Sequence, residues 1–171
     1  MLVIEGPDHV GKTTSAMVAA RSSGWAYRHL SKPHAEWDYW HDYLNMVQPS
    51  IIQDRFHLGA VVYGLVCGLH EVGAHTMESL FDLHRILTKR GVVTCIMYAE
   101  EDSWLRDHLQ RKMKEEMYDS EVIVEANRVF RLLTQRGQWC DFCWPVDVNG
   151  WPSEGEVKTW VELTTRLNSS K

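Results

Sequence analysis

Short apolar runs alternate with longer mixed stretches along the whole chain. A continuous apolar run typical of a buried strand covers residues 1–5, and further strands are predicted over residues 25–30, 50–56, 91–99 and 144–150. The stretches between them predict helices over residues 12–23, 34–47, 58–70, 76–90, 102–116, 120–136 and 154–167, the last capped by Ser153. This alternation predicts a three-layer α/β fold of the P-loop NTPase type, with a mostly parallel five-stranded sheet flanked by helices.

The length, net charge and cysteine content of the chain limit the classes of protein to which it can belong. A length of 171 residues without repeats or linkers predicts a single domain over residues 1–171. The net charge of -5 argues against a surface that coats nucleic acid. The chain begins without a secretory signal and has no membrane-length apolar run, so we expect a cytoplasmic protein without a membrane partner. Cys140 and Cys143 lack two further ligands at zinc-site spacing, and no metal is assigned to cysteine.

The stretch GPDHVGKTT, residues 6–14, carries the strongest motif. Gly6, Gly11, Lys12 and Thr13 fit G-x-x-x-x-G-K-[ST], with a strand before and a helix after. In such a loop backbone N–H groups surround phosphate oxygens, the lysine reaches the β- and γ-phosphates, and the hydroxyl ligates Mg²⁺. The motif predicts ATP and Mg²⁺ as cofactors. The residues assigned to ATP in this loop are Gly6, Asp8, His9, Val10, Gly11, Lys12, Thr13 and Thr14.

A P-loop alone does not separate GTPases, ATPase motors and small kinases. The chain has no NKxD sequence for guanine and no long apolar strand that ends in paired acids. It is also too short for the additional elements of a motor. A compact kinase is the class that these absences favour.

A second stretch, DRFHLGAVVYG at residues 54–64, follows the third expected strand. Asp54, Arg55, Phe56 and Tyr63 resemble the acceptor motif of thymidylate kinases, in register, and Asp8 matches the aspartate of that family's P-loop. Two positions depart from the family: Gly59 and Gly64 replace a serine and a glutamine, which leaves the accepted base undetermined. The chain is shorter than cellular thymidylate kinases, a size typical of a phage or viral enzyme working in the host cytoplasm.

The resemblance implies roles on the acceptor side. Asp8 would accept a hydrogen bond from the 3′-hydroxyl of a deoxynucleotide, and Arg55 would hold the acceptor phosphate. Asp54 would lie beside the water shell of Mg²⁺, as a second metal-site residue next to Thr13.

Apart from the resemblance, several aromatic side chains could stack on a nucleobase. Phe56 and Tyr63 are preferred over Trp37, Trp40 and Tyr43, because an aromatic stripe at helical spacing is more typical of a core.

Lys32 bears on the kind of acceptor. It stands where thymidylate kinases carry an arginine for the acceptor phosphate, and where the related deoxynucleoside kinases carry a glutamate that deprotonates a hydroxyl. A phosphate acceptor needs cations, whereas a hydroxyl acceptor needs a general base. Lys32 therefore favours a monophosphate, although Glu36 nearby keeps a nucleoside acceptor open.

A charged stretch at residues 106–119 resembles the lid that closes on ATP in this family. Arg111, and after it Arg106, would bring positive charge to the transferring phosphoryl group. The alternative is a solvated helix, which is the preferred interpretation for Lys112 and Lys114. Trp151, after the last expected strand, lies where the family packs the adenine of ATP.

The sequence as a whole predicts a phosphotransferase that uses ATP to convert a deoxynucleoside monophosphate, dTMP by preference, into the diphosphate. The alternatives are a deoxynucleoside kinase, a P-loop kinase that acts on a modified base in DNA, and a nucleotide-binding module without catalysis. The expected partners are small nucleotides rather than nucleic acids, and a homodimer is left open.

Overall fold

The computed structural model describes residues 1–30, 39–68, 77–112 and 119–169. Within them, parallel strands form one sheet in the order β2-β3-β1-β4-β5. The order places β1 at the centre, so the loop that follows β1 emerges in the middle of the carboxyl edge of the sheet. The strands are β1 (Leu2–Glu5), β2 (Ala26–His29), β3 (Ile51–Asp54), β4 (Val93–Tyr98) and β5 (Phe142–Pro145).

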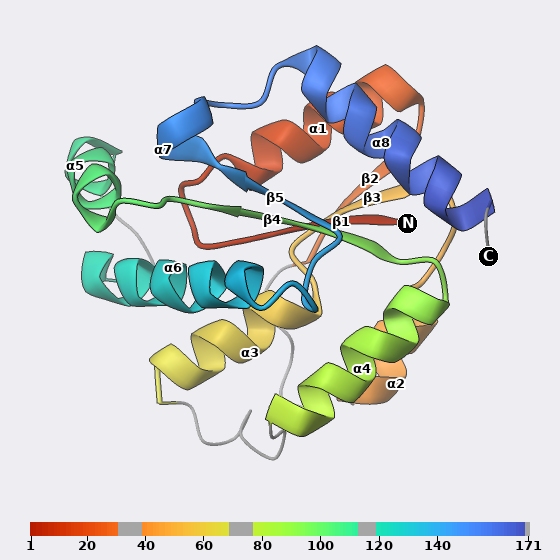
Figure 1. Cartoon of the computed structure of the whole chain (residues 1–171), viewed down its shortest axis with the longest axis horizontal. Coiled ribbons are helices and arrows are strands. Elements are labelled where there is room, and N and C mark those ends of the chain that lie inside the picture. The colour runs from red at the N-terminus through yellow and green to blue at the C-terminus, as the bar shows by residue number, and fades with distance from the viewer. Residues whose placement is uncertain (31–38, 69–76, 113–118, 170–171) are drawn as a thin grey trace.

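Helices cover both faces of the sheet and give the predicted three layers (Figure 1). On one face α1 packs against α8, and on the other α3 packs against α6 and α4. The helices are α1 (Lys12–Ser23), α2 (Tyr39–Asn45), α3 (His57–Val66), α4 (Met77–Lys89), α5 (Asp102–Lys112), α6 (Ser120–Gln135), α7 (Val146–Asn149) and α8 (Glu154–Ser169). Ser153 caps α8 as expected, with its hydroxyl accepting from the Glu156 N–H at 3.3 Å and its own N–H donating to the Glu156 carboxylate.

Each face of the sheet has its own apolar core. One core brings together Phe56, Leu83 and Phe130, and the other brings together Ala16 and Val157. The strands β1, β3 and β4 are buried along their whole length. Burial on both faces explains why β1 and β4 are mostly apolar in the sequence, whereas β3 ends in the buried polar residues Gln53 and Asp54. This packing holds the carboxyl ends of the strands, where the site lies, as one rigid edge.

The prediction of a last strand over residues 144–150 is wrong. The strand covers Phe142–Pro145, and residues 146–149 form the short helix α7. Pro145 has no N–H with which to continue a ladder. Asp147 in α7 accepts hydrogen bonds from the backbone N–H groups of Glu100 and Glu101, at 2.9 and 2.6 Å respectively. The helical turn therefore ties β5 to the chain that follows β4.

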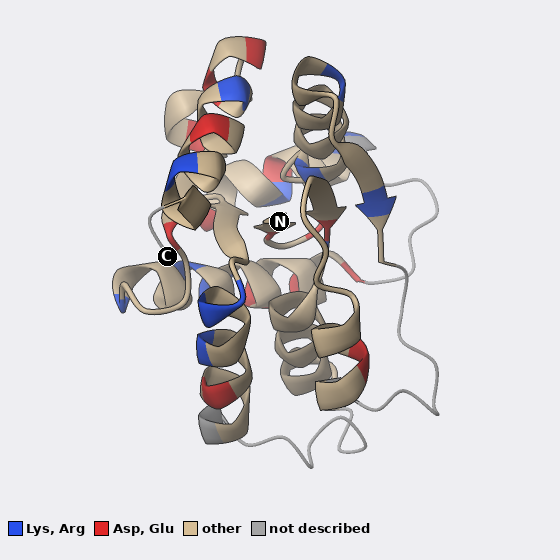
Figure 2. Ribbon diagram, turned by 90° about the vertical axis from the view of Figure 1, so that its right-hand side faces the viewer, with Lys and Arg blue, Asp and Glu red and all other residues tan. Residues whose placement is uncertain are grey.

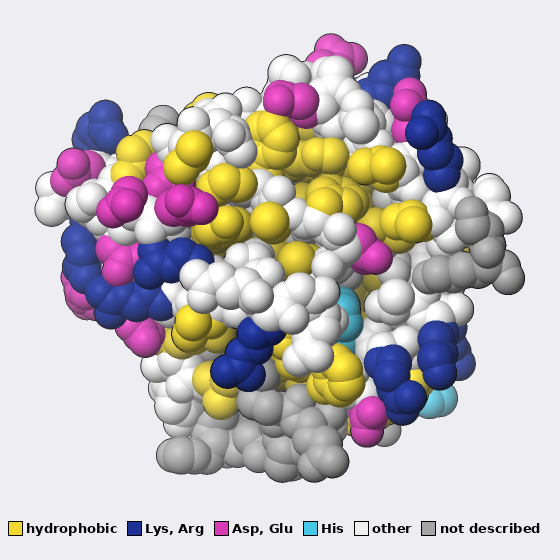
Figure 3. Space-filling model, in the orientation of Figure 1, with side chains coloured by type: hydrophobic (Ala, Val, Ile, Leu, Met, Phe, Trp, Pro, Cys, Tyr) yellow, Lys and Arg dark blue, Asp and Glu magenta, His cyan; other side chains and the backbone are white. Residues whose placement is uncertain are grey.

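The surface carries both signs of charge. Acidic and basic residues are interspersed on the helices rather than gathered into a stripe (Figure 2). Apolar side chains gather on the face that presents β5, an edge strand of the sheet (Figure 3). None of the described helices has the length and apolar character needed to cross a membrane.

The homodimer stays a prediction.

Candidate active site

The P-loop follows a path that requires glycine at two positions. Gly6 has a φ of 142°, and a Cβ there would lie 2.0 Å from the carbonyl oxygen of Met97 in β4. Gly11 has a φ of 82°, and a Cβ there would lie 2.7 Å from the ring of Trp151. The first glycine lets the loop pass close to the sheet, and the second lets an aromatic ring lie against it.

Lys12 is folded back over its own loop. Its side chain is 4% exposed, and its ammonium donates to the carbonyl oxygen of Pro7 and lies 3.6 Å from Asp8 Oδ1. Burial lowers the pKa of the Lys12 ammonium from its usual value, while the Asp8 carboxylate acts in the opposite direction. The ammonium is thus partly desolvated and directed into the loop, where a phosphate group would replace the carbonyl as its partner.

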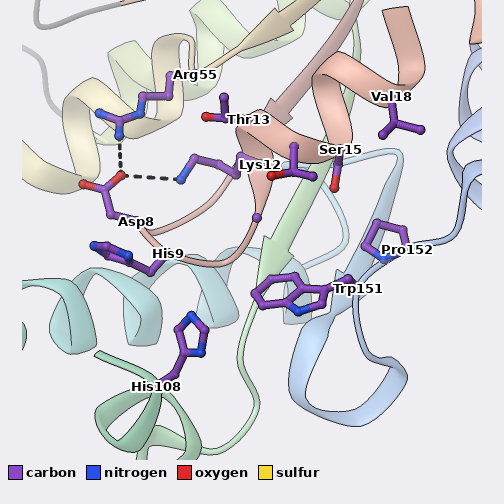
Figure 4. Close-up of a pocket in the computed structure, with 12 residues that line it drawn as sticks. Asp8, His9, Lys12, Thr13, Ser15, Val18, Arg55, His108, Trp151 and Pro152 are labelled. Atoms are coloured by element: carbon purple, nitrogen blue, oxygen red, sulfur yellow. Dashed lines mark hydrogen bonds and ion pairs between the residues drawn. The ribbon is translucent and has the colours of Figure 1, made fainter. Parts of the chain in front are cut away.

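Asp8 joins the P-loop to the segment that follows β3. Its Oδ1 atom lies 2.5 Å from the guanidinium of Arg55 (Figure 4). Its backbone N–H donates to the hydroxyl of Tyr63 in α3 at 2.8 Å. The structure therefore brings together three of the residues predicted for the acceptor side.

Asp54, at the carboxyl end of β3, is the centre of a second cluster. Its Oδ2 atom accepts from the Thr13 hydroxyl at 2.6 Å and from the Tyr27 hydroxyl at 3.2 Å, and it lies 2.8 Å from His29 Nδ1. Its Oδ1 atom is buried and has no hydrogen-bond partner among the described residues. The sequence prediction included Thr13 but missed Tyr27 and His29. Pairing of β2 with β3 places His29 opposite Asp54.

A cavity of about 530 Å³ lies over the P-loop. Predicted P-loop residues line it together with Arg55, His108 and Trp151, and Val18 and Pro152 contribute at its edge (Figure 4). The rings of His108 and Trp151 lie 5.7 Å apart, and His108 also stacks on Trp104 at 5.1 Å. The contribution of His108 was missed, and the spacing of four residues from Trp104 on one helix was the available signal. The predicted P-loop residues in the lining are Asp8, His9, Gly11, Lys12, Thr13 and Thr14, and Ser15 of α1 lies next to them.

Comparison with solved structures identifies the fold. The YorR protein from Bacillus subtilis, in complex with phosphorylated GDP, matches at a TM-score of 0.69 and 16% identity, over 99% of this chain and 98% of YorR. Deoxyadenosine kinase from M. mycoides with bound dATP matches at a TM-score of 0.53 and 12% identity, over 96% of this chain and 98% of the kinase. This chain has the P-loop NTPase fold. No protein-family model and no curated protein matches it.

Several predicted residues lie away from the cavity of this P-loop NTPase fold. The ring of Phe56 is 1% exposed and packs edge-on against Tyr43, so it is a core residue without a free face for a base. Val10 is fully buried, which leaves only its backbone to face a ligand.

The lid arginines do not line the cavity either. Arg106 pairs with Glu121, and Arg111 donates to the backbone of Asp107 on its own helix at 3.0 Å. Lys32, Glu36 and Lys114 lie outside the described residues, as does the side chain of Lys112. The roles predicted for Arg106, Arg111 and Lys32 stay predictions.

The cluster around Asp54 fits the Mg²⁺ that the P-loop NTPase fold implies. Mg²⁺ prefers oxygen ligands and keeps part of its water shell. Thr13 supplies a hydroxyl oxygen at the loop, and Asp54 Oδ1 supplies a buried carboxylate oxygen that lacks a partner among the described residues. Within the described part of the chain, no group of three or more His, Cys, Asp or Glu side chains is arranged to hold a metal ion.

Proposed function

We propose that this protein is a kinase that uses ATP and Mg²⁺ to phosphorylate a deoxynucleoside monophosphate, with dTMP as the preferred acceptor. The observation that carries the proposal is the meeting of Lys12 and Arg55 at Asp8. Lys12 comes from the donor loop and Arg55 from the segment after β3, and both reach Asp8 Oδ1, at 3.6 and 2.5 Å. Two cations from different elements at one cavity suit two phosphate groups that must be brought together.

On the donor side, the P-loop N–H groups and the start of α1 would bind the phosphates of ATP. Lys12 would leave the Pro7 carbonyl and contact the β- and γ-phosphate oxygens. Trp151 and His108, at the other end of the cavity, would contact the adenine with their rings. Thr13 and Asp54 would hold Mg²⁺, whose charge would offset the charge on the phosphates during transfer.

On the acceptor side, Arg55 would grip the acceptor phosphate with its planar fork of N–H donors. Asp8 would then accept from the 3′-hydroxyl of the sugar. A phosphate oxygen is already a nucleophile, so the transfer would need no general base from the protein and would run directly and in line. Arg111 and Lys32 would add positive charge once both substrates are bound.

A deoxynucleoside kinase is the second candidate, and one observation favours it. His29 Nδ1 lies 2.8 Å from the buried Asp54, so a carboxylate orients an imidazole at the carboxyl edge of the sheet. A hydroxyl acceptor could use such a group as a base. The two similar structures leave both candidates open, since one contains phosphorylated GDP and the other is a deoxyadenosine kinase.

An ADP-release assay separates the candidates. Purified protein is given ATP and Mg²⁺ with each deoxynucleoside, each deoxynucleoside monophosphate or modified-base DNA. The Lys12→Ala variant measures the background, because it lacks the ammonium group that would contact the β- and γ-phosphates. The proposal predicts ADP formation that depends on a monophosphate and is lost in the variant. Activity with nucleosides alone would establish the second candidate instead.

A further inference from the structure

A buried carboxylate next to the P-loop has no part in the chemistry described above. Glu5 is the last residue of β1, directly before Gly6, and its side chain is 0% exposed. Burial raises the pKa of Glu5 to about 7, against the opposing effects of backbone N–H groups and of Lys12. Burying a carboxyl group costs free energy of folding unless hydrogen-bond donors inside the protein replace its contacts with water. The partners of Glu5 therefore indicate what it does.

Those partners lie at the start of α3. Glu5 Oε1 accepts from the backbone N–H of Phe56 at 3.0 Å and of Leu58 at 2.9 Å. Glu5 Oε2 accepts from the N–H of Gly59 at 3.2 Å. The first N–H groups of a helix have no partner within the helix and carry partial positive charge. The cap residue of α3 itself, Phe56, offers no side-chain oxygen, so a residue from β1 satisfies these groups.

The segment that Glu5 holds includes a strained turn. Arg55 has a φ of 63°, in the left-handed region that a residue with a side chain seldom adopts. The Arg55 N–H donates to the Ile4 carbonyl at 3.1 Å, and the side chain of Gln53 donates to the Arg55 carbonyl at 2.9 Å. Strain of this kind persists only where surrounding contacts fix it. Glu5 fixes the side of the turn that leads into α3.

Gly59 fits the same arrangement. A Cβ at residue 59 would lie 3.0 Å from Glu5 Oε2, which is tighter than an ordinary contact. Glycine at this position, where the thymidylate kinase pattern has serine, lets the helix start approach the carboxylate closely. A departure from the family pattern thus has a local physical reason.

We propose that Glu5 is a positioning residue that holds Arg55 in place for the acceptor phosphate. The role in catalysis rests on the proposed function, whereas the structural link does not. Glu5 joins the start of the P-loop to the Asp54–Gly59 segment, so the donor and acceptor cations are held by one buried group. Arg55 is then already placed beside Asp8, 2.5 Å from its Oδ1 atom, before an acceptor phosphate arrives.

The test compares Glu5→Gln with a matched control. Glutamine keeps the shape of the side chain and one accepting oxygen, but its NH₂ group cannot accept from an N–H. Asp147→Asn is the control, because Asp147 also accepts two backbone N–H groups, before α5, and does not line the cavity. Gly59→Ala is a second variant, which displaces the carboxylate without removing it and serves if Glu5→Gln does not fold.

Two readouts do not depend on enzyme activity. Amide hydrogen exchange at Phe56, Leu58 and Gly59 should become about tenfold faster in Glu5→Gln, the loss expected for about one hydrogen bond. The Arg55 Nε–H resonance should shift in the same variant. Neither should change in Asp147→Asn. Unchanged exchange and an unchanged Arg55 resonance would overturn the proposal even if the protein is a kinase.

The third readout tests the link to catalysis. With a monophosphate acceptor, Glu5→Gln should raise the acceptor KM about tenfold and leave the Kd of ATP within about twofold. If Glu5 acts through Arg55, its effect should vanish in the Arg55→Ala background. Additive effects of the two substitutions would overturn the positioning role. If the wild-type protein phosphorylates no monophosphate while the exchange and resonance changes still appear, the proposed function fails and the structural link stands.

Discussion

The guanidinium of Arg55 lies 2.5 Å from Asp8 Oδ1, so the segment after β3 is tied directly to the P-loop. The same oxygen of Asp8 lies 3.6 Å from the ammonium of Lys12. One carboxylate therefore holds two cations, and an arriving phosphate would compete with it for both. The carboxylate keeps the cations from repelling each other in a partly buried site.

Replacing Asp8 should uncouple the two sides of the site. In Asp8→Asn the charge that holds Arg55 is lost, and the amide cannot accept from a sugar hydroxyl as strongly as a carboxylate does. We expect the acceptor KM to rise about tenfold and the preference for a 3′-hydroxyl over a 3′-deoxy acceptor to shrink. Steady-state rates with the two acceptors measure both effects. Equal selectivity in wild type and variant would remove Asp8 from the acceptor site.

Asp54 should matter for metal-dependent transfer rather than for folding. The Asp54→Asn side chain can still form hydrogen bonds with Thr13, Tyr27 and His29 through its amide oxygen and NH₂ group. It lacks the negative charge next to the proposed Mg²⁺. We expect kcat to fall by at least about a hundredfold, with a higher Mg²⁺ concentration needed for half-maximal rate. Binding of Mn²⁺ with ATP, followed by electron paramagnetic resonance, gives a readout apart from turnover. Wild-type Mn²⁺ binding in the variant would contradict the assignment.

The aromatic end of the cavity predicts a separable effect on ATP. Trp151 is 49% exposed and lies against Gly11, next to His108. Trp151→Leu should raise the KM of ATP about tenfold, since stacking on a base is worth about 1–3 kcal/mol, and leave the acceptor KM unchanged. Leu163→Ala in α8 is a control for an exposed apolar residue outside the cavity. A change in the acceptor KM without a change in the KM of ATP would show that Trp151 contacts the acceptor and not the adenine of ATP.

The donor side of the site could be predicted from sequence because its motif is contiguous. Residues 6–14 specify their own loop, and the helix over residues 12–23 was predicted with the observed bounds. The environment of Asp54 was harder to foresee, because Tyr27 and His29 reach it only through the pairing of β2 with β3. Phe56 was assigned to a base because it is aromatic and in register. Its ring is buried against Tyr43 of α2, a residue outside the motif.

A buried histidine pair predicts sensitivity to acid. His57 Nε2 and His84 Nδ1 lie 2.9 Å apart, between α3 and α4. Burial lowers the pKa of His57 well below 6.5 and that of His84 from 6.5 to about 4, although Asp141 acts in the opposite direction on His84. Because both folded-state pKa values are depressed, stability is fully present above pH 6.5 and is lost as the pH falls towards 4.

Urea unfolding between pH 7.5 and pH 4.5 measures this effect. His84 alone should account for roughly 2.5 kcal/mol of lost unfolding free energy at pH 4.5. His84→Asn should flatten the pH dependence below pH 6.5. His41→Gln, at an exposed position of α2, should leave it unchanged. A wild-type protein with constant stability from pH 7.5 to 4.5 would show that the pair is not held neutral.

The most direct test of the proposed function identifies the product. Wild-type protein is incubated with ATP, Mg²⁺ and dTMP, and separately with thymidine, and the products are resolved by phosphorus NMR. We predict that dTMP yields dTDP and ADP in equal amounts, that thymidine yields nothing, and that Lys12→Ala yields nothing with either. Phosphorylation of thymidine without phosphorylation of dTMP, or no transfer to either acceptor by folded wild-type protein, would contradict the proposal.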